Sequence, residues 1–148
     1  MEGKSDTDFI AALRGHGLQV TYQRLAIYKA LYCTNEEHPS VEFIYQQVKK
    51  RFPMISLGTV YKTLEKFYEV GLVQKVSPIS EVARYEAKTG AHHHMVCLEC
   101  QSIQDADQIV EVPNISVSGD SGFRVVRQQV VLHGYCPSCR GNISAPKP

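Results

Sequence analysis

Residues 92–100 read HHHMVCLEC and decide the interpretation of the whole chain. The stretch joins three adjacent histidines to a Cys-x-x-Cys pair, Cys97 and Cys100. A second pair, Cys136 and Cys139, lies beyond 35 intervening residues. Each pair places two thiolates on one tight turn, and two such turns can supply the four sulfur ligands of tetrahedral zinc. These cysteines therefore predict a structural Zn²⁺ site whose binding energy contributes to folding.

The alternatives for the cysteines are a disulfide pair or a redox-active Cys-x-x-Cys. No apolar run approaches the roughly 20 residues that span a bilayer, so we expect no membrane association. Residues 1–15 carry no signal-peptide pattern. We therefore expect a cytoplasmic protein, whose reduced thiols favour zinc over a disulfide. Cys33 has no partner motif and ends an apolar helical pattern, so we expect it in the core.

The histidines need a different site, because the cysteines already supply four ligands. In a strand, His92 and His94 share one face and His93 takes the other. Two imidazoles with carboxylates from elsewhere suit Fe²⁺, Mn²⁺ or Zn²⁺. Glu86 precedes the histidines and Asp105 follows the first cysteine pair. Spacing alone leaves ordinary solvent-exposed histidines as an equal alternative.

Upstream, apolar residues recur at helical spacing in four segments. We expect helices over residues 7–14, 21–33, 40–52 and 56–71. Thr21, Ser40 and Ser56 are suitable N-caps, and Pro53 stops the third helix. Two alternating segments, residues 72–76 and 82–86, then predict a hairpin. Helices followed by a hairpin indicate a winged helix-turn-helix.

The fourth helix would expose Thr59 and Lys62, with Tyr61 at the edge of its buried stripe. A helix of this kind fits the major groove of DNA, although an ordinary solvated helix face gives the same pattern. Residues 1–90 hold 12 Lys and Arg against 10 Asp and Glu, whereas residues 91–148 hold 4 against 5. The first part is therefore the better partner for a phosphate backbone.

Downstream, short strands are expected at residues 95–97 and 102–104, and a long β-rich run covers residues 123–135. Residues 141–148 contain two prolines, and we expect a disordered tail from about residue 141.

Several motifs together resemble the ferric uptake regulator (Fur) family. They are Leu13-Arg14-x-x-Gly17-Leu18, Thr21-x-Gln23-Arg24, Gly58-Thr-Val-Tyr-Lys-Thr-Leu64, Gly71-Leu72-Val73, the His-rich run before Cys97-x-x-Cys100, and Gly134-Tyr135-Cys136-Pro-x-Cys139. They stand in the family's order and cover roughly residues 9–140. The resemblance implies an α+β protein with a winged-helix domain at 1–87 and a zinc-stabilised α/β dimerisation and metal-sensing domain at 88–148. It also implies a homodimeric, non-enzymatic repressor of palindromic operator DNA.

The resemblance further implies a regulatory Fe²⁺ or Mn²⁺. Its ligands would be His38, Glu86, His92, His94 and Asp105. The cation would fix the orientation of the winged helices and shift the population toward the DNA-binding form. The contacts with DNA would come from Arg14, Thr59, Tyr61 and Lys62.

Some residues depart from the family pattern or leave its branch open. The family usually forms a helix at residues 112–122, but Pro113 and two glycines oppose a long one. Gln128 stands where some iron sensors have a histidine ligand, so no third metal site is expected.

A peroxide sensor remains an alternative. In such members, bound Fe²⁺ drives oxidation of a ligand histidine, by resemblance His38 or His92. A glutamate at the position of Glu86 resembles the iron sensors more than the peroxide sensors. A zinc-uptake regulator, a zinc-stabilised interaction module and a zinc hydrolase using His92, His94 and Glu86 are further alternatives. No HExxH-type motif supports the hydrolase.

Overall fold

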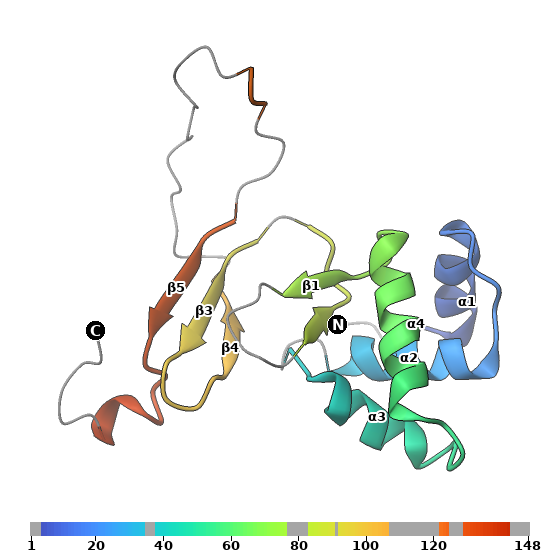
Figure 1. Ribbon diagram of the computed structural model, residues 1–148, viewed down its shortest axis with the longest axis horizontal. Coiled ribbons are helices and arrows are strands. Elements are labelled where there is room, and N and C mark those ends of the chain that lie inside the picture. The colour runs from blue at the N-terminus through green and yellow to red at the C-terminus, as the bar shows by residue number, and fades with distance from the viewer. Residues whose placement is uncertain are drawn as a thin grey trace. The chain divides into compact units, whose positions relative to one another are not determined.

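The computed structural model describes residues 4–34, 38–76, 83–90, 92–106, 122–124 and 129–142. The chain divides into two compact units, Met1–Thr89 and Gly90–Pro148. Among the described residues, the first unit holds four α-helices and a two-stranded sheet, and the second holds a three-stranded sheet (Figure 1).

Side-chain caps begin the helices of the first unit. The helices are α1 (Asp6–Gly15), α2 (Tyr22–Cys33), α3 (Val41–Lys49) and α4 (Leu57–Glu69). Thr21, Ser40 and Ser56 each accept a backbone N–H of the following first turn, as the sequence predicted. Helix α1 begins before the predicted Thr7, because Ser5 and Asp8 form a reciprocal capping box. Helix α3 ends at Lys49, short of the predicted residue 52.

The four helices bury one face each in a common core. In α4 the buried residues are Val60, Leu64 and Phe67, whereas Lys62 is exposed, as expected. Aromatic edges extend the core, since the Tyr28 ring meets the rings of Phe9 and Phe67 at centroid distances of 5.5 and 5.8 Å. Burying a large apolar side chain contributes about 1.5–3 kcal/mol. The first unit therefore has a hydrophobic core of its own.

Cys33 corrects one expectation, because it is exposed rather than in the core. Helix α2 turns Ile27, Tyr28 and Leu31 inward. Cys33 lies two residues beyond Leu31, which is about 200° around the helix and therefore on the opposite side.

The wing of the first unit is tied to α4. Strand β1 (Gln74–Val76) pairs antiparallel with β2 (Arg84–Glu86), and residues 77–82 of the predicted hairpin lie outside the described residues. Tyr85 of β2 is fully buried, and its hydroxyl donates to the Glu65 carboxylate of α4. Lys75 of β1 donates to the same carboxylate over 2.8 Å. Glu65 thus joins both wing strands to α4.

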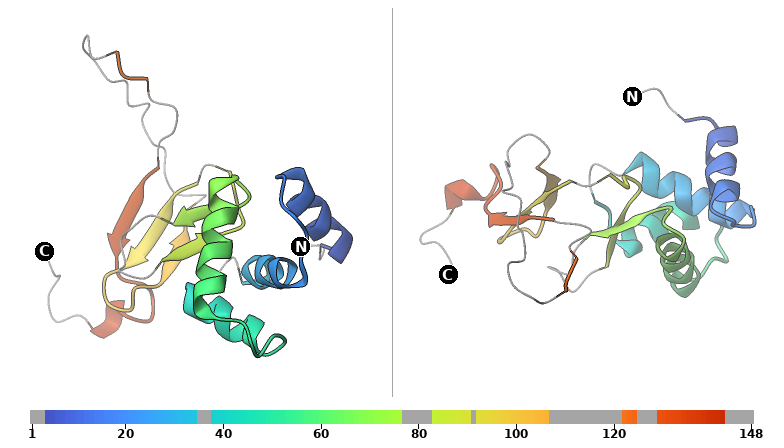
Figure 2. Two further views of the ribbon diagram at one scale, coloured as in Figure 1. Left: turned by 45° about the vertical axis from the view of Figure 1, so that its right-hand side comes forward. Right: turned by 90° about the horizontal axis from the view of Figure 1, so that it is seen from above.

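The second unit is a small mixed sheet. Strand β3 (His94–Cys97) pairs antiparallel with β4 (Ile103–Asp105) and parallel with β5 (Val131–Gly134), in the order β4-β3-β5. Figure 2 shows the three strands side by side. Only residues 131–134 of the expected long run form a strand here, and residues 125–128 lie outside the described residues.

Other expectations fall at the edges of the described chain. Residues 112–121, where the family usually has a helix, lie outside it. Arg140–Asn142 forms a 3₁₀ turn, and the rest of the predicted tail, residues 143–148, also lies outside it. Within the described part of the chain, every helix is too short or too polar to cross a membrane.

We predict that Tyr85→Phe lowers the free energy of unfolding by about 1–2 kcal/mol, because the buried ring stays while its hydrogen bond to a charged carboxylate is lost. Urea denaturation of the zinc-loaded chain, followed by helical circular dichroism, measures the change. Tyr45→Phe is the matched control and should shift stability by less than about 0.5 kcal/mol.

The loss should also depend on pH. Lys75 and then Tyr85 lower the pKa of Glu65. Their stabilisation is therefore present above the unfolded-state pKa of Glu65 and disappears as the pH falls through the lower, folded-state pKa. Equal losses for Tyr85→Phe at pH 7 and about pH 3 would contradict the role assigned to the ionised carboxylate.

Candidate metal and DNA-binding sites

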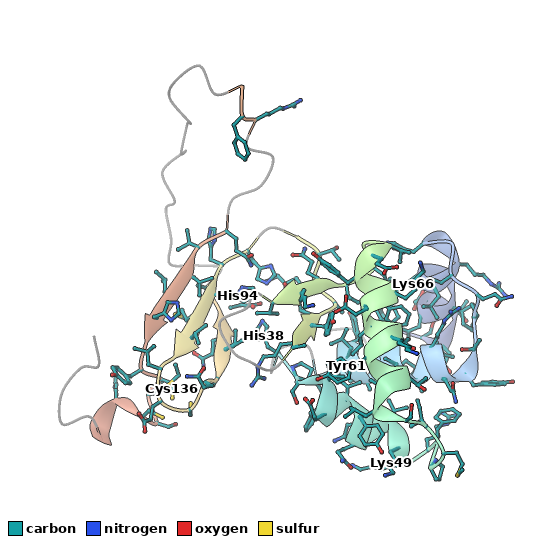
Figure 3. The ribbon with its side chains drawn as sticks, viewed as in Figure 1. His38, Lys49, Tyr61, Lys66, His94 and Cys136 are labelled. Atoms are coloured by element: carbon teal, nitrogen blue, oxygen red, sulfur yellow. The ribbon has the colours of Figure 1, made fainter. Side chains whose placement is uncertain are left out.

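The two cysteine pairs meet at one edge of the second unit's sheet. Cys97 ends β3, and Cys136 follows the end of β5. Because β3 and β5 are parallel, with Cys97 opposite Gly134, both pairs stand at the same edge. One Sγ atom from each of Cys97, Cys100, Cys136 and Cys139 lies within 4.8 Å of all the others. Figure 3 shows sulfur atoms gathered beside Cys136.

The spacing of these sulfurs fits zinc. The Sγ atoms of Cys100 and Cys136 are 3.8 Å apart. A tetrahedron with Zn–S bonds of about 2.3 Å has edges of about 3.8 Å. A disulfide needs about 2.05 Å, and all five cysteines are free thiols. The four predicted cysteines are therefore brought together with the geometry of a closed zinc site.

The surroundings shift the pKa values of these thiols in different directions. Backbone N–H groups of Cys136 and Cys100 point at the Cys97 sulfur and lower the pKa of that thiol to about 6. The Ser102 hydroxyl likewise lowers the pKa of Cys100. The sulfurs of Cys136 and Cys100 raise the pKa of Cys139 to about 12. Four thiolates at this spacing repel one another, so a cation among them is needed for all to ionise together.

We predict that Cys97→Ser loses zinc and melts the second unit, because it removes one of four ligands from a site whose binding energy supports folding. Zinc content and thermal denaturation measure the effect. Cys33→Ser is the control, since Cys33 is exposed and outside the cluster. Full zinc content with unchanged melting in Cys97→Ser would contradict the assignment.

The first unit holds two of the predicted regulatory ligands, His38 and Glu86. The His38 Nε2 atom lies 3.3 Å from Glu86 Oε2, and each residue is 1% exposed. Arg84 of β2 donates to the His38 carbonyl over 2.6 Å, and an isolated β-bridge joins Ser40 to Arg84. His38 has a φ of +44°, a strained conformation that this anchoring maintains. Strand β2 thus positions both ligands.

The second unit holds the other three, His92, His94 and Asp105. His94 of β3 stands directly opposite Asp105 of β4. The Nε2 atoms of His92 and His94 lie 3.5 and 3.7 Å from the same Asp105 Oδ1 atom. His93 instead accepts a hydrogen bond from the Val130 N–H over 3.1 Å. His92 and His94 thus share one side, as the alternation predicted, and both face the Asp105 carboxylate, whereas His93 contacts the backbone of Val130.

Both clusters have the spacing of metal ligands. These separations of 3.3–3.7 Å are longer than ordinary hydrogen bonds. Ligands bonded to one cation at about 2.0–2.2 Å lie about 3.0–3.5 Å apart, close to what is observed. The Nδ1 atom of His92 lies 2.8 Å from the Gly90 carbonyl. Because a carbonyl only accepts, Nδ1 carries the proton, which makes Nε2 of the neutral ring the nitrogen that can bind a cation.

The residues predicted to contact DNA lie on α1 and α4, and two of them also bond within the protein. Arg14 and Lys62 are exposed. The Tyr61 hydroxyl donates to Glu42 of α3 over 2.7 Å, which raises the pKa of Tyr61 and lowers that of Glu42. The Thr59 hydroxyl lies 2.8 Å from that of the N-cap Ser56. Figure 3 marks Tyr61 along α4.

Sequence reasoning missed the residues that hold the site residues in place. Glu42, Arg84 and Gly90 belong to no motif, and their contacts arise only from folding. Gln128, expected not to be a ligand, lies outside the described residues.

The fold and these clusters define a winged helix-turn-helix protein with four cysteines placed to hold zinc and with histidine and carboxylate side chains of the type that bind divalent cations. The sequence model of the ferric uptake regulator family matches residues 15–133, and the chain belongs to that family.

Individual relatives agree with this placement. The chain is 37% identical to the transcriptional regulator FurA of Mycobacterium tuberculosis, over 89% of this chain and 90% of the relative. It is 32% identical to the peroxide-responsive repressor PerR of Staphylococcus saprophyticus, over 90% of each. The structure of the ferric uptake regulator from Pseudomonas aeruginosa with manganese matches with a TM-score of 0.63 and 26% identity, over 86% of this chain and 97% of that one.

These comparisons fix the class of function. The chain is a metal-dependent transcription regulator and not an enzyme, since its relatives are regulators. The zinc hydrolase alternative is therefore wrong. Its cofactors are a structural Zn²⁺ and a regulatory divalent cation.

Proposed function

We propose that this protein is a cytoplasmic, homodimeric repressor that binds palindromic operator DNA when Fe²⁺ or Mn²⁺ occupies its regulatory ligands. The observation that carries the proposal is the division of those ligands. His38 and Glu86 form a two-ligand set in the first unit, and His92, His94 and Asp105 form a three-ligand set in the second. Neither set alone satisfies an ion that prefers about six ligands.

We propose that one cation takes ligands from both units, because the three ligands of the second unit leave coordination positions open. The role of the bound cation would be to hold these five side chains together as its ligands. The zinc site is proposed to be separate and structural, held by Cys97, Cys100, Cys136 and Cys139.

The first unit's own contacts would transmit the effect to α4. Arg84 holds the His38 backbone, and β2 carries Glu86. Tyr85, the neighbour of Glu86, donates to Glu65 of α4. The orientation of α4 would therefore follow the orientation of its ligand pair. Restricting that orientation raises the population that can match successive major grooves, which is how ligand-linked DNA binding arises.

The DNA-contacting surface is proposed to be α4, with Thr59, Tyr61 and Lys62 in the major groove and Arg14 reaching the minor groove. Lys62 supplies a positive charge toward phosphate, and Tyr61 supplies an aromatic edge and a hydroxyl. The Glu42 contact would hold the Tyr61 ring ready at the surface.

We predict that Tyr61→Ala and Lys62→Ala weaken operator binding while folding and dimerisation persist. Tyr61→Ala should cost about 1–3 kcal/mol, or about 5- to 160-fold in affinity. Lys62→Ala should lower the salt dependence by about one phosphate contact. Fluorescence anisotropy at several salt concentrations measures both, and circular dichroism with gel filtration checks the fold and the dimer.

Lys29→Ala is the matched control for charge, since Lys29 pairs with Asp6 and lies on α2 rather than α4. Operator affinity that falls equally in Lys29→Ala and Lys62→Ala would contradict the assignment of α4.

We predict that His38→Ala abolishes metal-dependent DNA binding and leaves the structural zinc in place, because the cation then loses a first-unit ligand. Zinc-loaded protein is titrated anaerobically with Fe²⁺ or Mn²⁺ on labelled DNA from upstream of its own gene, and anisotropy reports binding. His16→Ala is the control, since His16 is exposed on the first unit. Metal-responsive binding by His38→Ala equal to that of the unaltered protein would overturn the proposed ligand set.

A peroxide-sensing repressor is the second candidate, favoured by the similarity to PerR and by the His92–His94–Asp105 arrangement. The same titration separates the two candidates. Loss of DNA binding when peroxide is added to the Fe²⁺-loaded complex supports the peroxide sensor, and retention supports the iron or manganese sensor.

A further inference from the structure

One residue of the second unit that is in neither proposed ligand set, Gln129, contacts a proposed ligand, His94. The side-chain amide nitrogen of Gln129, Nε2, lies 3.1 Å from the Nδ1 atom of His94. Gln129 stands just before β5, and His94 begins β3. The other ring nitrogen of His94, Nε2, faces Asp105. The two nitrogens of this ring therefore face two different partners.

A histidine that offers Nε2 to a cation must carry its proton on Nδ1. That proton needs an acceptor, because the His94 side chain is 1% exposed and has little access to water. The Gln129 amide provides one in only one of its two orientations. With its oxygen toward His94, the amide accepts a hydrogen bond from Nδ1–H. With its NH₂ group toward His94, it donates to an Nδ1 that carries no proton, and this favours the tautomer whose protonated Nε2 cannot bind a cation. In the structure the NH₂ nitrogen faces Nδ1, and a half-turn of the amide places the oxygen there instead.

His92 shows what a fixed partner does. Its Nδ1 atom faces the Gly90 carbonyl, which can only accept. In the neutral His92 ring this partner fixes Nε2 as the nitrogen that can bind a cation, whereas in His94 the choice depends on an amide that can turn over.

We propose that Gln129 is a positioning residue for the regulatory cation: its side-chain oxygen accepts the Nδ1 proton of His94 and directs the Nε2 lone pair toward the cation. The inference rests on the proposed function, because it takes His94 to be a ligand. Outer partners of this kind fix the tautomer of a ligand histidine and raise its basicity.

The same strand pair connects Gln129 to the cysteine cluster. Parallel pairing places Val131 opposite His94 and Gly134 opposite Cys97. One end of this pair therefore carries the Gln129–His94 contact, and the other carries the cysteines. A shift of β5 along β3 would withdraw Gln129 from His94, so the cysteine cluster holds the register on which the contact depends.

The test is Mn²⁺ affinity of the zinc-loaded full chain, measured from the electron paramagnetic resonance signal of free Mn²⁺. Gln129→Leu keeps much of the side-chain volume but cannot accept, and it should weaken Mn²⁺ binding by about 10- to 100-fold. Gln129→Glu presents only acceptors and should bind Mn²⁺ at least as tightly as the unaltered chain. Circular dichroism and zinc content confirm that each variant is folded.

A second readout follows the tautomer itself. Nitrogen NMR of the His94 ring in zinc-loaded, Mn²⁺-free protein should show the Nδ1 proton in Gln129→Glu and a tautomer mixture in Gln129→Leu. A purely structural role for Gln129 would leave the ring signature unchanged. Gln104→Leu and Gln104→Glu are matched controls, because they make the same changes in volume and charge. Gln104 is exposed on β4 of the same sheet.

The outcomes separate this inference from the proposed function. Unchanged Mn²⁺ affinity in folded Gln129→Leu overturns the role of Gln129 while the regulatory site stands. Failure of the unaltered zinc-loaded chain to bind Mn²⁺ overturns both. If Gln104→Glu raises the Mn²⁺ affinity as much as Gln129→Glu does, the added negative charge explains the gain. That result also counts against the inference.

Discussion

The second unit depends on four sulfur atoms held within 4.8 Å of one another. Its strands are three or four residues long, and sheets this small bury too little surface to be stable without a further constraint. The cysteine cluster ties the ends of β3 and β5 together, and zinc at that cluster would supply the missing stability. The register that results sets His94 opposite Asp105 and brings Gln129 to the other side of the same ring.

The first unit is built on the opposite principle. Its helices share a hydrophobic core, and its charged contacts serve to connect parts rather than to hold the fold. Glu65 accepts from both wing strands, so the strand that carries Glu86 is joined to α4. In the proposed mechanism, a helical DNA-binding unit and a zinc-stabilised second unit each carry part of the regulatory ligand set. In this account, regulation lies in completing both sets with one ion.

Local patterns explain what the sequence could predict. Caps at Thr21, Ser40 and Ser56 and the apolar stripe of α4 are signals within one helix, and the four cysteines form two short motifs, so these features were found. The prediction that His38 is a metal ligand rested only on the family resemblance, because a single histidine in a loop forms no local motif. The Tyr61–Glu42 and His94–Gln129 contacts could not be predicted from the sequence, because they depend on how separate elements pack. Cys33 was misplaced because apolar neighbours do not reveal which side of a helix a residue occupies.

In the proposed mechanism, a divalent cation restricts the orientation of the first unit with respect to the second. Single-molecule energy transfer tests it most directly, with dyes at exposed Met54 in the first unit and exposed Gln104 in the second, on zinc-loaded protein without DNA. We expect a broad distance distribution that narrows to one population when Mn²⁺ is added, and a distribution that stays broad in His38→Ala. The same distribution with and without Mn²⁺ would contradict it.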